Sequence, residues 1–190
     1  MIPESDFFFW QFLMKQCKTN DEIFIFGSAR GAYAALYLAD MIERVGFLPG
    51  NKEELIPTVW KAYQGWRQNK LAESKRQIKK RRKLFTTIKG FRETACRPAG
   101  RVRFIGLFDM IGCSRWRPRP KSAMRLYLNP STAQYIRHAV SINEGRSELS
   151  PSLLQPMGEN HEMTDIQEVW FPGSHDVSDQ PNVAAVDLPH

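Results

Sequence analysis

The sequence predicts an α/β fold with a mostly parallel sheet and helices on both faces. Segments rich in apolar residues at 22–26, 101–108 and 168–171 have the length of strands. Between the first two, residues 31–45 repeat apolar side chains at helical spacing. Strands that alternate with helices imply parallel pairing, because parallel strands need a long crossover connection. A chain of 190 residues with 42% hydrophobic residues can fill the core of one such domain.

The first half of the chain is expected to alternate between helices and strands. A helix at residues 5–17 precedes the strand at 22–26, which is apolar from Ile23 to Phe26, as in a strand buried on both faces. The helix at 31–45 ends before Gly46, a common residue just beyond a helix C-terminus. Residues 47–100 are mainly polar and are predicted to be mostly helical.

The second half is expected to hold two further strands and one helix. Residues 101–108 form a strand that ends at Asp109. Residues 130–140 are interpreted as a helix that begins at a proline, which is favoured in the first helical turn. The strand at 168–171 is closed by Pro-Gly, and His175 follows shortly after it.

The net charge of +7 is unevenly distributed. Residues 151–190 contain seven acidic residues and no lysine or arginine, whereas the run Lys75–Lys83 is almost entirely basic. Such a run can bind nucleic acid or an anionic lipid surface, direct a protein to the nucleus, or be the solvated face of a helix. Aromatic residues are not interleaved with it, which disfavours a surface on which bases stack.

Cysteine usage indicates a cytoplasmic protein, with a nuclear location as the alternative because of Lys75–Lys83. The three cysteines are far apart and form no CxxC pair, as is usual in a reducing compartment. No stretch approaches 18 apolar residues, so no transmembrane segment is expected. Neither a metal nor a cofactor is predicted, because His161-Glu162 lacks the second histidine of a zinc motif and no P-loop is present.

A tight turn of Gly27, Ser28, Ala29, Arg30 and Gly31 joins the first strand to the helix after it. A strand, a glycine-bounded turn that carries a serine, and a helix form the layout of a nucleophile elbow, Gly-x-Ser-x-Gly. The frame from Gly27 to Gly31 puts Ala29 at the nucleophile position and leaves Ser28 one residue early. The alternative is a turn that binds a phosphate at the helix N-terminus, although the lysine of a P-loop is missing.

Three predicted strand ends carry Ser28, Asp109 and His175, in that order along the chain. Sites form at the carboxyl ends of parallel strands, and the order serine, aspartate, histidine is that of α/β-hydrolases. An imidazole takes the proton of a serine hydroxyl, and a carboxylate fixes the tautomer of that imidazole. Alternatively, Asp109 is an ordinary turn residue and His175 an ordinary surface residue.

Four blocks of the sequence resemble the α/β-hydrolase domain family that includes the type VI secretion phospholipase effectors, with fungal and bacterial members. The blocks occur in the family's order at residues 21–33, 104–112, 137–144 and 168–175. The resemblance implies a partial α/β-hydrolase fold whose early strands are missing. It also implies one domain at residues 1–177, incomplete at its N-terminus, and a loose tail at 178–190.

Position by position, the resemblance implies Asp109 as the triad acid and His175 as the triad base. Ala29 falls at the family's nucleophile position, and Ser28 replaces a family phenylalanine. The early strand–helix loop that supplies one oxyanion donor has no counterpart here. The histidine loop also lacks the family's glycines after His175.

These features predict a degenerate or truncated serine hydrolase with little or no activity. Loss of the catalytic serine costs about 10⁶-fold in rate in subtilisin, and a displacement of about 1 Å costs 10²-fold. One alternative is an active lipid or carboxylic-ester hydrolase that uses Ser28. A second is a basic binding or scaffold module that retains the fold and binds an anionic surface through Lys75 to Lys83. Missing strands also leave a sheet edge that favours self-association.

Overall fold

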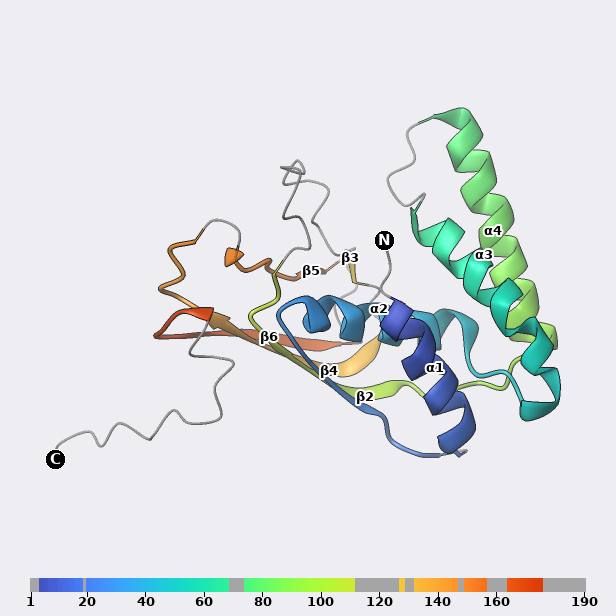
Figure 1. Ribbon diagram of the computed structural model, residues 1–190, viewed down its shortest axis with the longest axis horizontal. Helices are drawn as coiled ribbons and strands as arrows, with labels where there is room; N and C mark the ends of the chain where they lie inside the picture. The colour runs from blue at the N-terminus through green and yellow to red at the C-terminus, as the bar shows by residue number, and fades with distance from the viewer. Residues whose placement is uncertain are drawn as a thin grey trace, which may run out of the picture.

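A computed structural model of the protein describes residues 4–18, 20–68, 74–111, 127–128, 132–146, 149–156 and 164–175. The predicted tail at 178–190 and the His161-Glu162 pair lie outside these residues. The described residues form a four-stranded parallel sheet with helices packed beside it (Figure 1), which confirms the predicted α/β class.

The strand order in the main sheet is β1-β2-β4-β6, so β1 and β6 are the edge strands. The strands are β1 (Phe24–Ser28), β2 (Val102–Phe108), β4 (Ala133–Ser141) and β6 (Asp165–Phe171). A separate pair of short parallel strands consists of β3 (Tyr127–Leu128) and β5 (Gln155–Pro156).

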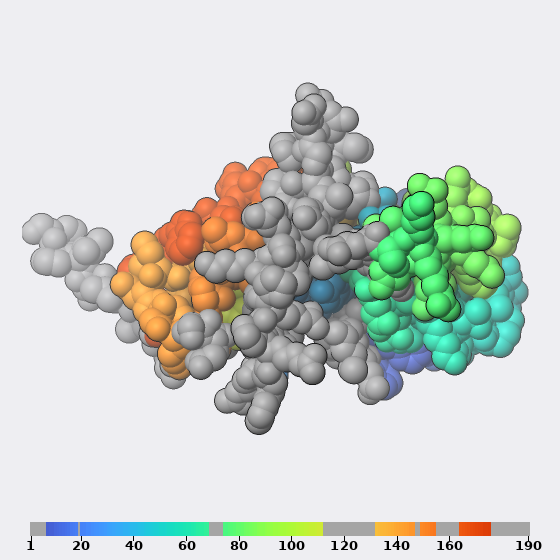
Figure 2. Space-filling model, turned by 90° about the horizontal axis from the view of Figure 1, so that it is seen from above, coloured from blue at the N-terminus to red at the C-terminus, as the bar shows by residue number. Residues whose placement is uncertain are grey.

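The helices of the described residues lie in the first half of the chain, where the sequence predicts most of them. They are α1 (Glu4–Gln16), α2 (Arg30–Val45), the 3₁₀ helix η1 (Gly50–Leu55), α3 (Ile56–Gln68) and α4 (Lys75–Thr94). Figure 2 shows α4, in green, at one end of the molecule and the segments around β4 and β6, in orange, at the other. No helix in the described part of the chain is long and apolar enough to span a bilayer.

The prediction of a helix at residues 130–140 is wrong, because residues Ala133–Ser141 form the strand β4. Ile136 and Val140 are buried four residues apart, a spacing that fits one face of a helix as well as alternate positions of a strand. Whether this segment forms a helix or a strand is decided by its pairing with other strands, which the local sequence does not reveal. Strand β4 pairs with β2 on one side and with β6 on the other.

Helix α2 packs closely on one face of the sheet. It contacts β1 and β2, and its buried residues Ala32, Ala35 and Ala39 let the helix approach the strands. The approach is closest at Gly27, where an added Cβ atom would lie 2.4 Å from the carbonyl oxygen of Gly31. A glycine is therefore required at residue 27, one position before the end of β1.

The opposite face of the sheet carries exposed aromatic rings. Parallel register puts Phe24, Phe26, Phe108, Tyr135 and Phe171 on this face, which we call the open aromatic face. The most exposed is Phe26, at 64%. The described helices leave these rings uncovered, so the second helical layer predicted for this face is not found among the described residues.

Helices α3 and α4 pack against each other beside α2. Trp60, Tyr63 and Trp66 of α3 are buried, as expected for core residues. The Tyr63 hydroxyl donates a hydrogen bond of 2.9 Å to the buried Asp40 carboxylate of α2. Burial and this carboxylate raise the pKa of Tyr63 well above its ordinary value. The hydroxyl therefore remains a hydrogen-bond donor that joins α3 to α2.

Candidate functional site

Ala29 lies in the turn between β1 and α2, and its backbone is strained. Its φ and ψ are 52° and −117°, which is unusual for a residue with a Cβ atom. Its N–H donates a hydrogen bond of 2.9 Å to the carbonyl oxygen of Phe108, at the end of the neighbouring strand. Arg30 and Gly31 follow as the first, exposed residues of α2. The turn thus has the sharp strand-to-helix geometry of a nucleophile elbow, with a methyl group at its centre.

Ser28 is the last residue of β1 and so belongs to the strand. Side chains alternate between the two faces of a strand. The missing Cβ of Gly27 points at the first turn of α2, so Ser28 points to the other face, together with Phe26. The hydroxyl of Ser28 and the methyl of Ala29 therefore have different directions.

Asp109 follows β2 directly and is held by β4. Its backbone N–H donates to the carbonyl oxygen of Ala139 at 2.8 Å. Its side-chain Oδ1 accepts the backbone N–H of Ser141 at 2.5 Å. Asp109 is 1% exposed and has a φ of 42°, an uncommon conformation that is favoured by these two contacts.

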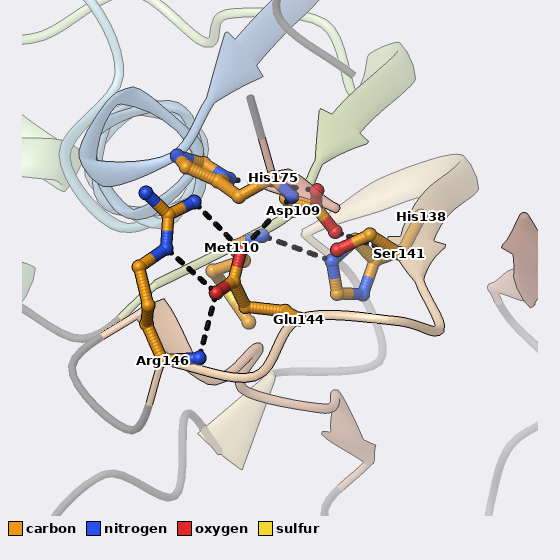
Figure 3. Close-up of polar contacts among 7 residues, drawn as sticks. All are labelled: Asp109, Met110, His138, Ser141, Glu144, Arg146 and His175. Atoms are coloured by element: carbon orange, nitrogen blue, oxygen red, sulfur yellow. Dashed lines mark hydrogen bonds and ion pairs between the residues drawn. The ribbon is translucent and has the colours of Figure 1, made fainter. Parts of the chain in front are cut away.

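The structure brings His175 to Asp109. The Nδ1 atom of His175 lies 3.4 Å from Oδ2 of Asp109, and both side chains are buried (Figure 3). The imidazole comes from the segment that follows β6, and the carboxylate comes from the segment that follows β2. Two residues far apart in sequence thus form one carboxylate–imidazole pair, as strand-end topology predicts.

A clamp of residues 143–146 holds the segment that carries His175. The backbone N–H of Asn143 donates to the carbonyl oxygen of Gly173 at 3.0 Å, and the N–H of Gly173 donates to Oδ1 of Asn143 at 3.1 Å. The N–H of His175 itself donates to Oε2 of Glu144 at 3.0 Å. The clamp therefore fixes the position of His175 through hydrogen bonds to the backbone of its segment.

Glu144 is itself fixed by Arg146. The guanidinium of Arg146 donates to both carboxylate oxygens, with Nε to Oε1 at 2.8 Å and Nη2 to Oε2 at 2.9 Å. These bonds, together with the Arg146 backbone N–H, lower the pKa of Glu144 from 4.5 to about 2. Glu144 is thus ionised at neutral pH and able to accept the His175 N–H.

Sequence reasoning did not identify Ser141, Asn143, Glu144 and Arg146 as part of the site. The signal was present, because residues 137–144 form one of the four blocks that resemble the hydrolase family. Their contacts depend on the adjacency of β4 and β6, which the helical interpretation of residues 130–140 concealed.

Chemically, the pair of Asp109 and His175 resembles the acid and base of a hydrolytic triad. The carboxylate can hold Nδ1 protonated, which leaves Nε2 to take a proton from a hydroxyl or a water. Ala29 is hydrogen-bonded to the residue that precedes Asp109, so the elbow lies at the adjacent strand end. No group of three or more histidine, cysteine, aspartate or glutamate side chains suited to a metal ion occurs in the described ranges.

Comparison with known proteins identifies relatives of the chain. A family model described as "T6SS, Phospholipase effector Tle1-like, catalytic domain" matches residues 8–179. An uncharacterised protein of Saccharomyces cerevisiae, YEL023C, is 33% identical over 152 residues, covering 77% of this chain and 20% of that protein. The chain thus spans about a fifth of this relative's length. No solved structure matches the chain. The extent of the family match shows that the chain belongs to the family of Tle1-like catalytic domains of type VI secretion phospholipase effectors.

Proposed function

We propose that this chain is a degenerate serine-hydrolase domain with little or no esterase activity. The observation that carries the proposal is the alanine at the strained elbow turn, where φ is 52° and no hydroxyl is available. Asp109 and His175 take the roles of acid and base beside it. Removing the nucleophile from a complete triad costs about 10⁶-fold in rate, so the remaining pair hydrolyses esters negligibly.

The rival proposal is an active hydrolase that uses Ser28. It requires the Ser28 hydroxyl to reach the imidazole of His175 from the last position of a strand. Because Ser28 and Ala29 point in different directions, such a hydroxyl is displaced from the elbow position by more than the roughly 1 Å that already costs 10²-fold. We therefore favour the degenerate form.

Labelling with a fluorophosphonate probe tests the two forms, because only an activated serine reacts. We expect no labelling of the wild-type protein and no turnover of short-chain p-nitrophenyl esters. The Ala29→Ser variant is expected to gain both, and the further change His175→Ala is expected to remove them again. Wild-type turnover that disappears in Ser28→Ala would overturn the proposal.

A lipid or carboxylic ester is the substrate class that we propose for the restored enzyme, since the matching family is described as phospholipase effectors. The measurement compares phospholipid vesicles with p-nitrophenyl esters for the Ala29→Ser variant. Hydrolysis of the soluble esters alone would restrict the proposal to a general esterase.

A second candidate function is binding of an anionic surface through α4. The helix buries Ile88 and directs Leu84 towards Gly65 of α3, so its apolar stripe faces α3. The basic residues of the run point elsewhere on the helix, and all but Arg81 are exposed: Lys75, Arg76, Lys79, Lys80, Arg82 and Lys83. The one acidic residue of α4, Glu93, pairs with Lys89 at 3.7 Å. Within α4 itself the basic face thus has little acidic compensation.

Co-sedimentation with vesicles of an anionic phospholipid, compared with neutral phosphatidylcholine vesicles, tests this second function. Each lysine near an anionic surface contributes about 1 kcal/mol, so Lys79→Gln, Lys80→Gln and Lys83→Gln together should weaken binding by roughly 100-fold. The control is Lys89→Gln, whose charge is already paired with Glu93. Equal binding to neutral vesicles would contradict the proposal, and tighter binding to duplex DNA would favour a nucleic-acid partner.

Self-association is proposed for the edge strand β1 and the adjoining open aromatic face. Among the described strands β1 is an edge, and an edge strand offers backbone groups to a second chain. Phe24 and Phe26 add exposed apolar surface beside it. Sedimentation velocity should show dimers whose fraction rises with protein concentration and falls in Phe26→Lys. A monomer at all concentrations would refute this proposal.

A further inference from the structure

A second histidine–carboxylate pair lies close to the first. His138 of β4 and Glu168 of β6 are register partners, and Nδ1 of His138 lies 2.8 Å from Oε1 of Glu168. The imidazole of His138 is completely buried, whereas the carboxylate of Glu168 is partly exposed. The pair does not contribute to the proposed chemistry directly, because His138 contacts the backbone of the Asp109 turn and not the His175 ring (Figure 3).

The contacts of His138 define one neutral tautomer. A carboxylate only accepts hydrogen bonds, so Nδ1 of His138 carries the proton and donates a hydrogen bond to Glu168. Nε2 then has a free lone pair, and it accepts the backbone N–H of Met110 at 3.2 Å. The opposite tautomer would place N–H against N–H at Met110 and two lone pairs against each other at Glu168.

Met110 directly follows Asp109, whose backbone has the uncommon φ of 42°. The turn therefore needs hydrogen bonds that fix its backbone, and both the N–H and the carbonyl group of Met110 make one. His138 accepts the Met110 N–H, and the Met110 carbonyl oxygen accepts the N–H of Ser152 at 2.7 Å. Glu168 also accepts the N–H of Leu154 at 2.9 Å, so the pair connects to the same nearby segment.

We infer that His138, fixed by Glu168, is a positioning residue that holds the Asp109 turn and so directs the Asp109 carboxylate at His175. The inference rests on the proposed roles of Asp109 and His175. It assigns His138 a task that differs from simple cross-strand stabilisation, because both backbone N–H groups that the pair accepts come from segments outside the main sheet.

The adjacent cross-strand pair provides a matched control. Arg137 of β4 and Asp165 of β6 also join the same two strands, with Nη2 and Oδ2 2.8 Å apart. Arg137 shares its side of the sheet with Gly106 and lies on the face opposite to His138. Its loss removes an ion pair between β4 and β6 and leaves the Met110 contact intact.

The first test uses NMR of the full chain, without any need for activity. The ring ¹⁵N shifts of His138 should show a protonated Nδ1 and an unprotonated Nε2. In Glu168→Ala, which removes the acceptor, and in His138→Leu, the Nδ1–H signal of His175 should move upfield or be lost to solvent exchange, as its contact with Asp109 loosens. His138→Gln keeps an oxygen that can accept the Met110 N–H and should preserve most of the signal, and Arg137→Gln should preserve all of it.

The second test measures kinetics in the Ala29→Ser background. A carboxylate misplaced by about 1 Å predicts a loss of up to roughly 100-fold in kcat with little change in KM. Glu168→Ala should show this loss, and Arg137→Gln should not. If Ala29→Ser proves inactive, the proposed acid and base roles of Asp109 and His175 fail, while the NMR signals still decide the role of His138. A His138 ring protonated at Nε2, or a His175 signal unchanged in both Glu168→Ala and His138→Leu, would overturn the inference. Unfolding of His138→Leu leaves Glu168→Ala as the deciding variant.

Discussion

The contact between Gly27 and the first turn of α2 makes a strong prediction about stability. In Gly27→Ala, the new Cβ atom would lie 2.4 Å from the Gly31 carbonyl oxygen and 2.8 Å from the backbone nitrogen of Ala32. Comfortable contacts are longer by roughly 1 Å. The opposing atoms belong to the backbone, so no side chain can rotate away. The start of α2 must therefore move away from β1, at the expense of its packing.

The magnitude follows from the rigidity of that contact. Overpacking a core costs typically 1–3 kcal/mol, and a clash with a helix backbone belongs at the upper end, so we expect about 3 kcal/mol. For a chain of this size, that loss lowers the melting temperature by roughly 6–12 °C. Urea denaturation followed by circular dichroism gives the free energy of unfolding directly.

Gly31→Ala is the matched control for this experiment. An added Cβ atom at Gly31 meets no atom within 4 Å, and alanine is a better helix former than glycine. Gly31→Ala should therefore be neutral or should stabilise the protein by up to about 1 kcal/mol. Equal free energies of unfolding for Gly27→Ala and Gly31→Ala would refute the close approach of α2 to β1.

Three further predictions concern strain and protonation. Ala29→Gly should stabilise the protein by about 1 kcal/mol in urea denaturation, because glycine adopts the positive φ of residue 29 without strain; a destabilised variant would contradict the strain. The Glu144 carboxylate has its pKa lowered from 4.5 to about 2, so its contribution to the clamp is complete above pH 4.5 and is lost as the pH falls towards 2. As the pH is lowered from 4.5 towards 2, the hydrogen-exchange protection of the His175 amide should therefore decrease. The control is the Ile142 amide, which donates to a carbonyl oxygen and should keep its protection. Burial raises the pKa of Cys96 from 9.0 to about 11, so alkylation of Cys96 at pH 8 should be about 100-fold slower in the folded protein than in denaturant, as peptide mapping can measure.

The sequence predicted the parts of the fold that rest on local patterns. The strand before the turn, the strand that ends at Asp109 and the helix after Gly31 each have an apolar run or period of the right length. The strand before the turn begins and ends two residues later than the predicted range of 22–26, and it includes Gly27 and Ser28. Local pattern does not determine where a strand ends when the residues beyond it are a glycine and a serine, whose strand propensities are low.

The proximity of Asp109 and His175 could also be predicted from the sequence. Residues at the carboxyl ends of parallel strands meet at one edge of the sheet, so chain order and strand type suffice. The residues that support this pair could not be predicted from the sequence. Glu144 contacts His175 and His138 contacts Met110 only because β4 lies between β2 and β6, and the sequence of β4 fits a helix equally well.

The pairing of β1 with β2 has a consequence for the order of folding. Phe24 lies beside Phe104, so this contact closes a long segment that contains α2, α3 and α4. The partners in β2, β4 and β6 are much closer together in sequence, for example Phe104 with Tyr135 and Tyr135 with Asp165. Contacts distant in sequence form slowly, so we expect β1 to join the sheet last. Doubling a flexible connection costs only about 0.6 kcal/mol, so additional residues between α3 and α4 would delay this step without unfolding the protein.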